Sequence, residues 1–121
     1  MLVVDDSPLL RRRVTAMIRE TRSDAVVAEA QNAAEALSLA SAQATRLVVL
    51  DLGLPDGSGL GLIEPLKQSA DPPVVVVLTN HATEHHRRES IARGADYFLD
   101  KSREFERVGE IVHLVASRTA P

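Results

Sequence analysis

Residues 47–51 read LVVLD and residues 74–79 read VVVVLT, and these two stretches decide the fold. Each is an unbroken run of branched apolar side chains that stops at a single polar residue. Apolar runs without alternation are typical of parallel strands that are buried on both faces. Because such a sheet needs helices on both sides, we expect the segments between the strands to be helical.

Three further stretches complete the predicted sheet. The expected strands are Leu2–Val4, Ala25–Ala30, Leu47–Leu50, Val74–Leu78 and Tyr97–Leu99. A helical pattern follows each strand, so the chain consists of five strand–helix units. This order predicts an α/β fold with a doubly wound, five-stranded parallel sheet in the flavodoxin-like order 2-1-3-4-5. We expect one domain over residues 1–121.

The expected helices differ in their sequence signals. The second begins with a capping-box pattern at Asn32–Glu35. The third contains Pro65, which removes an amide donor and should leave a kink or a short helix. The fourth, Glu84–Arg93, is mostly charged, so with Ile91 and Ala92 as its anchors it is the helix most ready to move. The apolar positions expected to face the core are Leu10, Val14, Met17 and Ile18 in the first helix, Ala33, Ala36, Leu37 and Ala40 in the second, and Phe105, Val108, Ile111, Val112 and Val115 in the last.

The composition excludes several classes of protein. Hydrophobic residues make up 45% of the chain but aromatic residues only 2%, so the core must consist of Val, Leu, Ile and Ala. A net charge of −3 argues against a nucleic-acid surface, and we expect the basic run Arg11–Arg13 to be a solvated helix face. The absence of cysteine excludes disulfides and thiolate chemistry and fits a cytoplasmic protein. We expect neither a signal peptide nor a membrane span, because no apolar run approaches about 20 residues.

Polar residues follow the expected strands at their carboxyl ends, where open α/β sheets place functional groups. They are Asp5, Asp6, Asp51, Thr79 and Lys101. Any one aspartate alone is compatible with a helix or turn cap. Together, however, three carboxylates from neighbouring strands repel one another unless a cation joins them, and Mg²⁺ suits such oxygen ligands. A carboxylate beside Mg²⁺ can attack a phosphoryl group, while the lysine and the threonine hold the transferred oxygens.

Four stretches resemble the receiver domains of two-component response regulators. They are VVDDSPLLRR (Val3–Arg12), VVLDLGLPDGSGL (Val48–Leu60), VVVLTNH (Val75–His81) and GADYFLDKS (Gly94–Ser102). The resemblance implies a signalling phospho-acceptor rather than an enzyme. A histidine kinase or a histidine phosphotransfer protein would donate the phosphoryl group, and a downstream protein would read the result.

The resemblance also implies a role for each polar residue. Asp51 would be the phospho-acceptor and Lys101 would contact the acyl phosphate. Asp6, Asp51 and the main-chain carbonyl of Gly53 would ligate Mg²⁺, with Asp5 acting partly through water.

A second set of residues would form the switch. Thr79 would bind the other phosphoryl oxygens and move toward them. Phe98, three residues before the lysine, holds the position of an aromatic that rotates inward when the threonine moves. The rotation would change the face made by the fourth helix, the fifth strand and the fifth helix.

Four departures from the family pattern involve five positions. Ser102 replaces a proline that is usually joined by a cis bond, and because a non-proline cis bond costs about 3–4 kcal/mol we expect the bond after the lysine to be trans. Asn80 is larger than the usual residue and would restrict access to the phosphate. Gly53 and His81 stand at the positions that tune phosphate lifetime. Phe98 lacks the hydroxyl of the commoner tyrosine, so either switching there rests on packing alone or the ring is a static part of the core.

Two alternatives stay open. Ser102 and Asn80 favour a receiver-like module that binds partners without being phosphorylated. The chain is also compatible with a receiver fragment of a longer regulator that carries an output domain. For residues 1–121 we expect no direct nucleic-acid binding, no membrane contact, and a monomer or a weak homodimer. A zinc site at His81 and His85 would need further ligands, so we expect those histidines on a solvated face.

Overall fold

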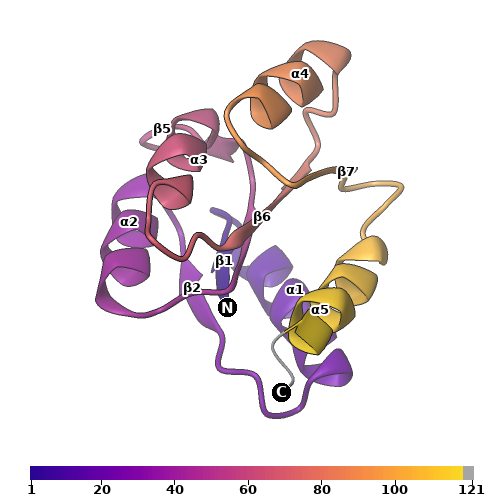
Figure 1. Ribbon diagram of the computed structural model, residues 1–121. Coiled ribbons are helices and arrows are strands. Elements are labelled where there is room, and N and C mark those ends of the chain that lie inside the picture. The colour runs from indigo at the N-terminus through magenta and orange to yellow at the C-terminus, as the bar shows by residue number, and fades with distance from the viewer. Residues whose placement is uncertain (119–121) are drawn as a thin grey trace.

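The computed structural model describes residues 1–118, apart from the side chains of Ser58 and Arg118. Its elements are β1 (Leu2–Val4), α1 (Pro8–Thr21), β2 (Ala28–Ala30), α2 (Ala33–Ala42), β3 (Leu47–Leu50), β4 (Gly53–Leu54), β5 (Gly57–Ser58), α3 (Leu60–Lys67), β6 (Val74–Thr79), α4 (Glu84–Ala92), β7 (Tyr97–Asp100) and α5 (Arg107–Arg118). Five strands form one parallel sheet in the order β2-β1-β3-β6-β7, while β4 and β5 pair separately as an antiparallel hairpin. Apart from that hairpin, which was not predicted, this is the expected order 2-1-3-4-5 (Figure 1).

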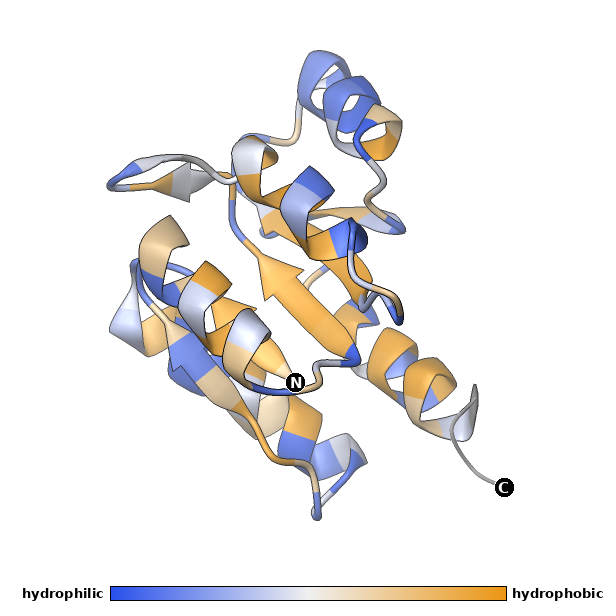
Figure 2. Cartoon of the chain, turned by 60° about the vertical axis from the view of Figure 1, so that its left-hand side comes forward, coloured by the Kyte–Doolittle hydropathy of each residue, from blue (hydrophilic) through white to orange (hydrophobic). Residues whose placement is uncertain are grey.

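Alternate residues of the central strand β3 pack on opposite faces of the sheet. Val48 and Leu50 join a core cluster that includes residues of α2 and α3. Leu47 and Val49 join a second cluster with residues of α1 and α5. None of the four is more than 3% exposed, so the prediction of a strand buried on both faces is confirmed. Figure 2 shows the apolar strands enclosed between helices that carry their hydrophilic residues outward.

The edge strand β2 is shorter than predicted. It begins at Ala28 rather than Ala25. Its only partner in the sheet is β1, whose three residues Leu2–Val4 pair with residues 28–30. An edge strand cannot extend its ladder beyond its partner, so residues 25–27 belong to the loop.

Two helices bury different residues from those expected. In α2, Ala36 is fully buried whereas Leu37 is 38% exposed. In α4, Ser90 is the buried residue, and both Ile91 and Ala92 are exposed. Successive helical residues point about 100° apart, so in α2 the side chain of Leu37 is turned away from the face on which Ala36 is buried. The helix α4 therefore buries no large apolar side chain, and most of its length is coloured as hydrophilic in Figure 2.

Phe105, expected on the last helix, precedes α5 and is only partly buried, whereas two other local expectations hold at least in part. The helix α3 contains Pro65 and is only 8 residues long. Asn32 caps α2 by accepting the N–H of Glu35 at 2.8 Å, although the Glu35 carboxylate accepts the N–H of Gln31 rather than that of the cap. Within residues 1–118 no helix is both long and apolar enough to cross a membrane.

The β4–β5 hairpin is tied to the start of α2. Its turn residue Asp56 accepts the N–H groups of Ala33 and Ala34, at 2.9 and 3.1 Å. These bonds favour the charged carboxylate, and the bond from Ala33 above all holds the pKa of Asp56 below its ordinary value of 3.8. The hairpin that follows the third strand is thereby attached to a helix more than 20 residues earlier in the chain.

Acidification should remove this contribution to stability. Because the pKa of Asp56 is lower in the folded than in the unfolded chain, its charge stabilises the fold above pH 3.8, and the effect is lost as the pH falls through the folded value. We expect Asp56→Asn to lower Tm near neutral pH and to lower it less below pH 3.8, in thermal melts at both conditions. Asp71→Asn, at an exposed position in the α3–β6 loop, is the matched control. A Tm difference that does not shrink on acidification would contradict the attachment.

Candidate functional site

Three carboxylates meet where β1 and β3 end. The register aligns Val4 with Leu50, so the residues that follow them, Asp5 and Asp51, leave neighbouring strands at the same edge of the sheet. Asp6 continues the first of these loops. Ligand oxygens of all three aspartates lie within 4.8 Å of one another. Asp5 and Asp51 are buried and Asp6 is exposed, so the cluster opens to solvent on one side.

Lys101 is the positive charge of this cluster. It follows β7, and its main-chain N–H donates to the carbonyl of Thr79 at 3.0 Å. Its Nζ lies 2.8 Å from Asp5 Oδ2 and 3.3 Å from Asp51 Oδ2, and only 12% of its side chain is exposed. One ammonium beside three carboxylates leaves these four residues with a net negative charge, which attracts a further cation.

The donor set fits a divalent metal ion. Asp51 Oδ1 is buried, and the part of the chain that the structure describes offers it no hydrogen-bond partner. A buried anionic oxygen without a partner is costly, and a bound cation removes that cost. Clustered carboxylate oxygens are the ligands that hard divalent cations prefer. We therefore identify Asp5, Asp6 and Asp51 as a candidate metal centre.

His81 lies beside the end of β3, close to Gly53, which has no side chain. A Cβ built on Gly53 would be 3.4 Å from His81 Nε2 and 3.9 Å from Asp51 Oδ2. The imidazole of His81 and the Asp51 carboxylate thus both lie near position 53. The two positions that the resemblance associates with phosphate lifetime, Gly53 and His81, are therefore neighbours in space. The neighbouring Asn80 is exposed.

The loop after Asp51 folds back onto its own strand. The N–H of Gly59 donates to the carbonyl of Leu52 at 2.8 Å. A Cβ on Gly59 would overlap the main-chain oxygen of Asp51, so only glycine fits there. Gly57 in the hairpin has φ of 135°, a conformation that favours glycine. The start of α3 thereby lies directly against the main chain of Asp51.

Thr79 and Phe98 are both buried. Thr79 is fully buried, and its hydroxyl accepts the N–H of His81 at 3.1 Å. Phe98 is 4% exposed and pairs with Val77 in the sheet register. The guanidinium of Arg87, on α4, lies 5.0 Å from the centre of the Phe98 ring, a cation–π distance. The mobile helix predicted from the sequence is thus in contact with the aromatic residue predicted to switch.

Ser102 fixes the turn that carries Lys101. The Lys101–Ser102 bond is trans, as expected. The Ser102 hydroxyl and N–H both donate to Asp100 Oδ1, at 2.7 and 2.9 Å. These bonds, the hydroxyl bond first, hold the pKa of Asp100 below its ordinary value. The serine thus makes a hydrogen-bonded turn where a proline is usual.

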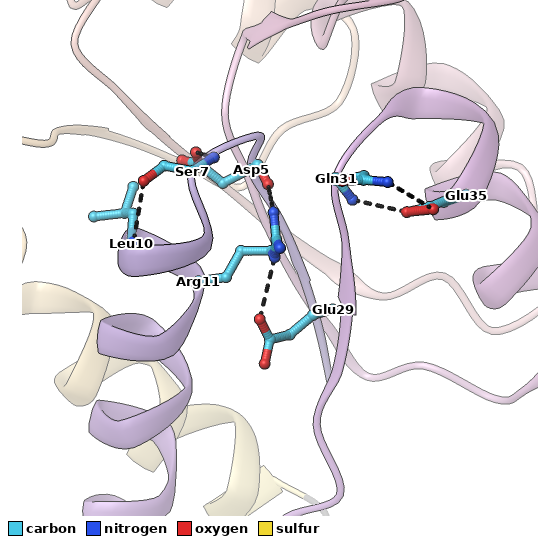
Figure 3. A network of polar contacts seen from close by, with 7 residues as sticks. All are labelled: Asp5, Ser7, Leu10, Arg11, Glu29, Gln31 and Glu35. Carbon is cyan, nitrogen blue, oxygen red and sulfur yellow. Dashed lines mark hydrogen bonds and ion pairs between the residues drawn. The ribbon is translucent and has the colours of Figure 1, made fainter.

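Arg11 was missed by the sequence analysis as a residue of this site. It was expected on a solvated face, but its side chain is only 15% exposed. Its Nη1 donates to the main-chain carbonyl of Asp5 at 2.7 Å, and its Nε lies 3.2 Å from Glu29 Oε1 (Figure 3). One sequence signal was available, because Arg11 stands one helical turn after the cap Ser7 and so returns to the face that meets β1.

Comparison with known proteins agrees with this geometry. The family model of the response regulator receiver domain matches residues 1–113. The nitrate/nitrite response regulator protein NarL of Escherichia coli (strain K12) is 31% identical over 117 residues, which are 97% of this chain and 54% of NarL. The sensory transduction protein LytR of Staphylococcus haemolyticus is 33% identical over 114 residues, which are 94% of this chain and 44% of LytR.

A solved structure of a response regulator is also similar to this chain. A response regulator protein from Burkholderia pseudomallei, with a phosphorylated aspartic acid, a calcium ion and citrate, is 28% identical and superposes with a TM-score of 0.78. The match covers 98% of this chain and 74% of that one. This chain spans about half the length of the two curated relatives. It belongs to the receiver domain family of the response regulators of two-component systems.

Proposed function

We propose that this chain is a phosphorylation switch in which Asp51 accepts a phosphoryl group from a histidine kinase or a histidine phosphotransfer protein. The observation that carries the proposal is the Asp51 carboxylate itself. Its Oδ1 is buried without a partner in the described chain, and its Oδ2 lies 3.3 Å from Lys101. The phosphorylated aspartic acid and calcium ion of the Burkholderia relative support it. We place the reaction in the cytoplasm, where such donors occur.

In the proposed transfer the Asp51 carboxylate attacks phosphorus. A P–O bond to Asp51 forms as the P–N bond of the donor phosphohistidine breaks, and the donor imidazole keeps the electron pair and takes a proton from solvent. The Lys101 ammonium, which pairs with Asp51 before the transfer, then pairs with the negatively charged phosphoryl oxygens. The Thr79 hydroxyl donates a hydrogen bond to the same oxygens. We propose that Asp5, Asp6, Asp51 and the Gly53 carbonyl hold Mg²⁺, which neutralises charge on the transferred group.

Intact mass after incubation with acetyl phosphate tests the proposal. We expect the wild-type protein to gain the mass of a phosphoryl group when Mg²⁺ is present, and to gain little when it is chelated. Asp51→Asn should gain none, because the amide is no nucleophile. Asp71→Asn, far from the site, should gain it like the wild type. A wild-type protein that gains no mass from acetyl phosphate or from a panel of kinases would instead be the unphosphorylated interaction module.

A chain of contacts connects the proposed site to α4. The Thr79 hydroxyl accepts the His81 N–H, the His81 carbonyl accepts the Thr83 N–H at 3.0 Å, and Thr83 caps α4 through the N–H of His86. If the Thr79 hydroxyl turns to a phosphoryl oxygen, the first of these bonds changes. We propose that this change moves α4 and Phe98 and alters the α4–β7–α5 face for a downstream protein.

A further inference from the structure

We propose that Arg11 is a positioning residue for the metal centre, fixing the Asp5–Asp6 peptide so that the Asp6 carboxylate faces the ion. The inference rests on the proposed function, since it assigns a residue to the same site. It concerns the affinity for Mg²⁺ and not the chemistry of transfer.

Asp5 is held at each of its polar groups. Its N–H donates to Ala30 at 3.1 Å, and its Oδ1 accepts the N–H of Ser7 at 2.9 Å. Its Oδ2 accepts from Lys101, and its carbonyl oxygen accepts from Arg11 at 2.7 Å (Figure 3). Of these contacts, only the hydrogen bond from Arg11 is made to the main-chain carbonyl oxygen, which belongs to the peptide that links Asp5 to Asp6.

The carbonyl of Asp5 is part of the planar peptide that extends to the Cα of Asp6. Rotation of this peptide would change the direction in which the Asp6 side chain leaves the backbone. Asp6 is exposed, so burial does not fix it as it fixes Asp5 and Asp51. The hydrogen bond from the Arg11 guanidinium therefore fixes the orientation of the Asp5–Asp6 peptide, which burial of the Asp6 side chain does not fix.

Glu29 holds Arg11 in place for this contact. It lies on β2 opposite Val3 of β1, and its Oε1 is 3.2 Å from Arg11 Nε. The fork of a guanidinium can bind a carbonyl and a carboxylate at the same time, whereas an ammonium is a single point of charge. Figure 3 shows the resulting connection from β2 through α1 to the end of β1.

Charge alone would give the opposite effect. A guanidinium near a cation repels it, so loss of Arg11 should strengthen Mg²⁺ binding if the residue acted only through its charge. Loss of an orienting contact should weaken binding, typically by about 10–100-fold. The sign of the change therefore separates positioning from electrostatics.

The experiment is a Mg²⁺ titration of the full chain, followed by NMR chemical shifts of the amides around Asp6 and Asp51. We expect Arg11→Ala to raise the Kd for Mg²⁺ by about 10-fold or more. Arg12→Ala is the matched control, because it removes a neighbouring exposed arginine from the same helix and should leave Kd unchanged or slightly lower. Phosphoryl uptake by Arg11→Ala should need correspondingly more Mg²⁺.

Two further variants decide the matter if Arg11→Ala is poorly folded. Arg11→Lys should bind Mg²⁺ more weakly than the wild type, although its charge is retained. Glu29→Ala should also raise Kd, and combining it with Arg11→Ala should add little, because both act through one contact. Equal or tighter Mg²⁺ binding in folded Arg11→Ala or Arg11→Lys overturns the positioning role alone. If the Arg11 variants bind Mg²⁺ more weakly but the wild-type protein takes up no phosphoryl group, the proposed function alone is overturned. A wild-type protein that binds no Mg²⁺ overturns both proposals.

Discussion

Replacing Lys101 with alanine should slow phosphoryl transfer to Asp51 by about 10²–10³-fold, the usual cost of removing one group that stabilises developing charge. The reason is that Lys101 Nζ lies 3.3 Å from Asp51 Oδ2. In the proposed transfer this ammonium pairs with the negatively charged phosphoryl oxygens. The measurement is the initial rate of mass gain with acetyl phosphate at saturating Mg²⁺. Lys67→Ala is the control, because Lys67 pairs with Asp96 elsewhere in the fold. A Lys101→Ala rate close to that of the wild type would remove Lys101 from the chemistry.

The same substitution should also destabilise the metal-free protein. It leaves the buried carboxylates of Asp5 and Asp51 without their counter-charge, and removing one partner of a buried ion pair costs about 3–5 kcal/mol. Mg²⁺ should restore more stability to Lys101→Ala than it adds to the wild type, because the ion then supplies the missing charge. Urea unfolding with and without Mg²⁺ measures both effects.

A second large effect is expected in the core under α3. Leu62 is 1% exposed within the cluster that α2 and α3 form with the sheet. We expect Leu62→Ala to lower the free energy of unfolding by about 2–5 kcal/mol, because it removes buried methyl groups and leaves a cavity. Leu114→Ala in α5 is the same substitution at a position that is 51% exposed, and should change stability by less than about 0.5 kcal/mol. If urea unfolding shows that Leu62→Ala and Leu114→Ala lose similar amounts of unfolding free energy, this assignment of the core is contradicted.

The sheet could be predicted because burial on both faces leaves a direct trace in the sequence. LVVL and VVVVLT became β3 and β6, whose residues are almost all buried. Once the strand order is known, the ends of the strands follow, and with them the approach of Asp51 to Asp5 and Lys101. The helix faces were less certain, since periodicity does not say which of several neighbouring residues meets the core, and in α4 it is Ser90, whereas both Ile91 and Ala92 are exposed.

Contacts between side chains that are distant in sequence could not be predicted. Arg11 and Glu29 are 18 residues apart, and their pairing depends on how α1 crosses β2. His81 contacts the Gly53 position only because β3 and β6 are neighbours in the sheet. Neither contact follows from the local pattern around its residues, because each depends on the packing of elements that are distant in sequence.

The close approach of Gly59 to the main chain of Asp51 leaves no space for another residue at position 59. Any side chain there would displace the main chain of Asp51, so a library of variants at position 59 should return only glycine under selection for folding, even where phosphorylation is not required. Position 53 differs, because a Cβ on Gly53 would meet its neighbours at ordinary van der Waals distances and alanine is therefore admissible. Among homologous sequences we therefore expect glycine to be invariant at position 59, whereas alanine can replace glycine at position 53.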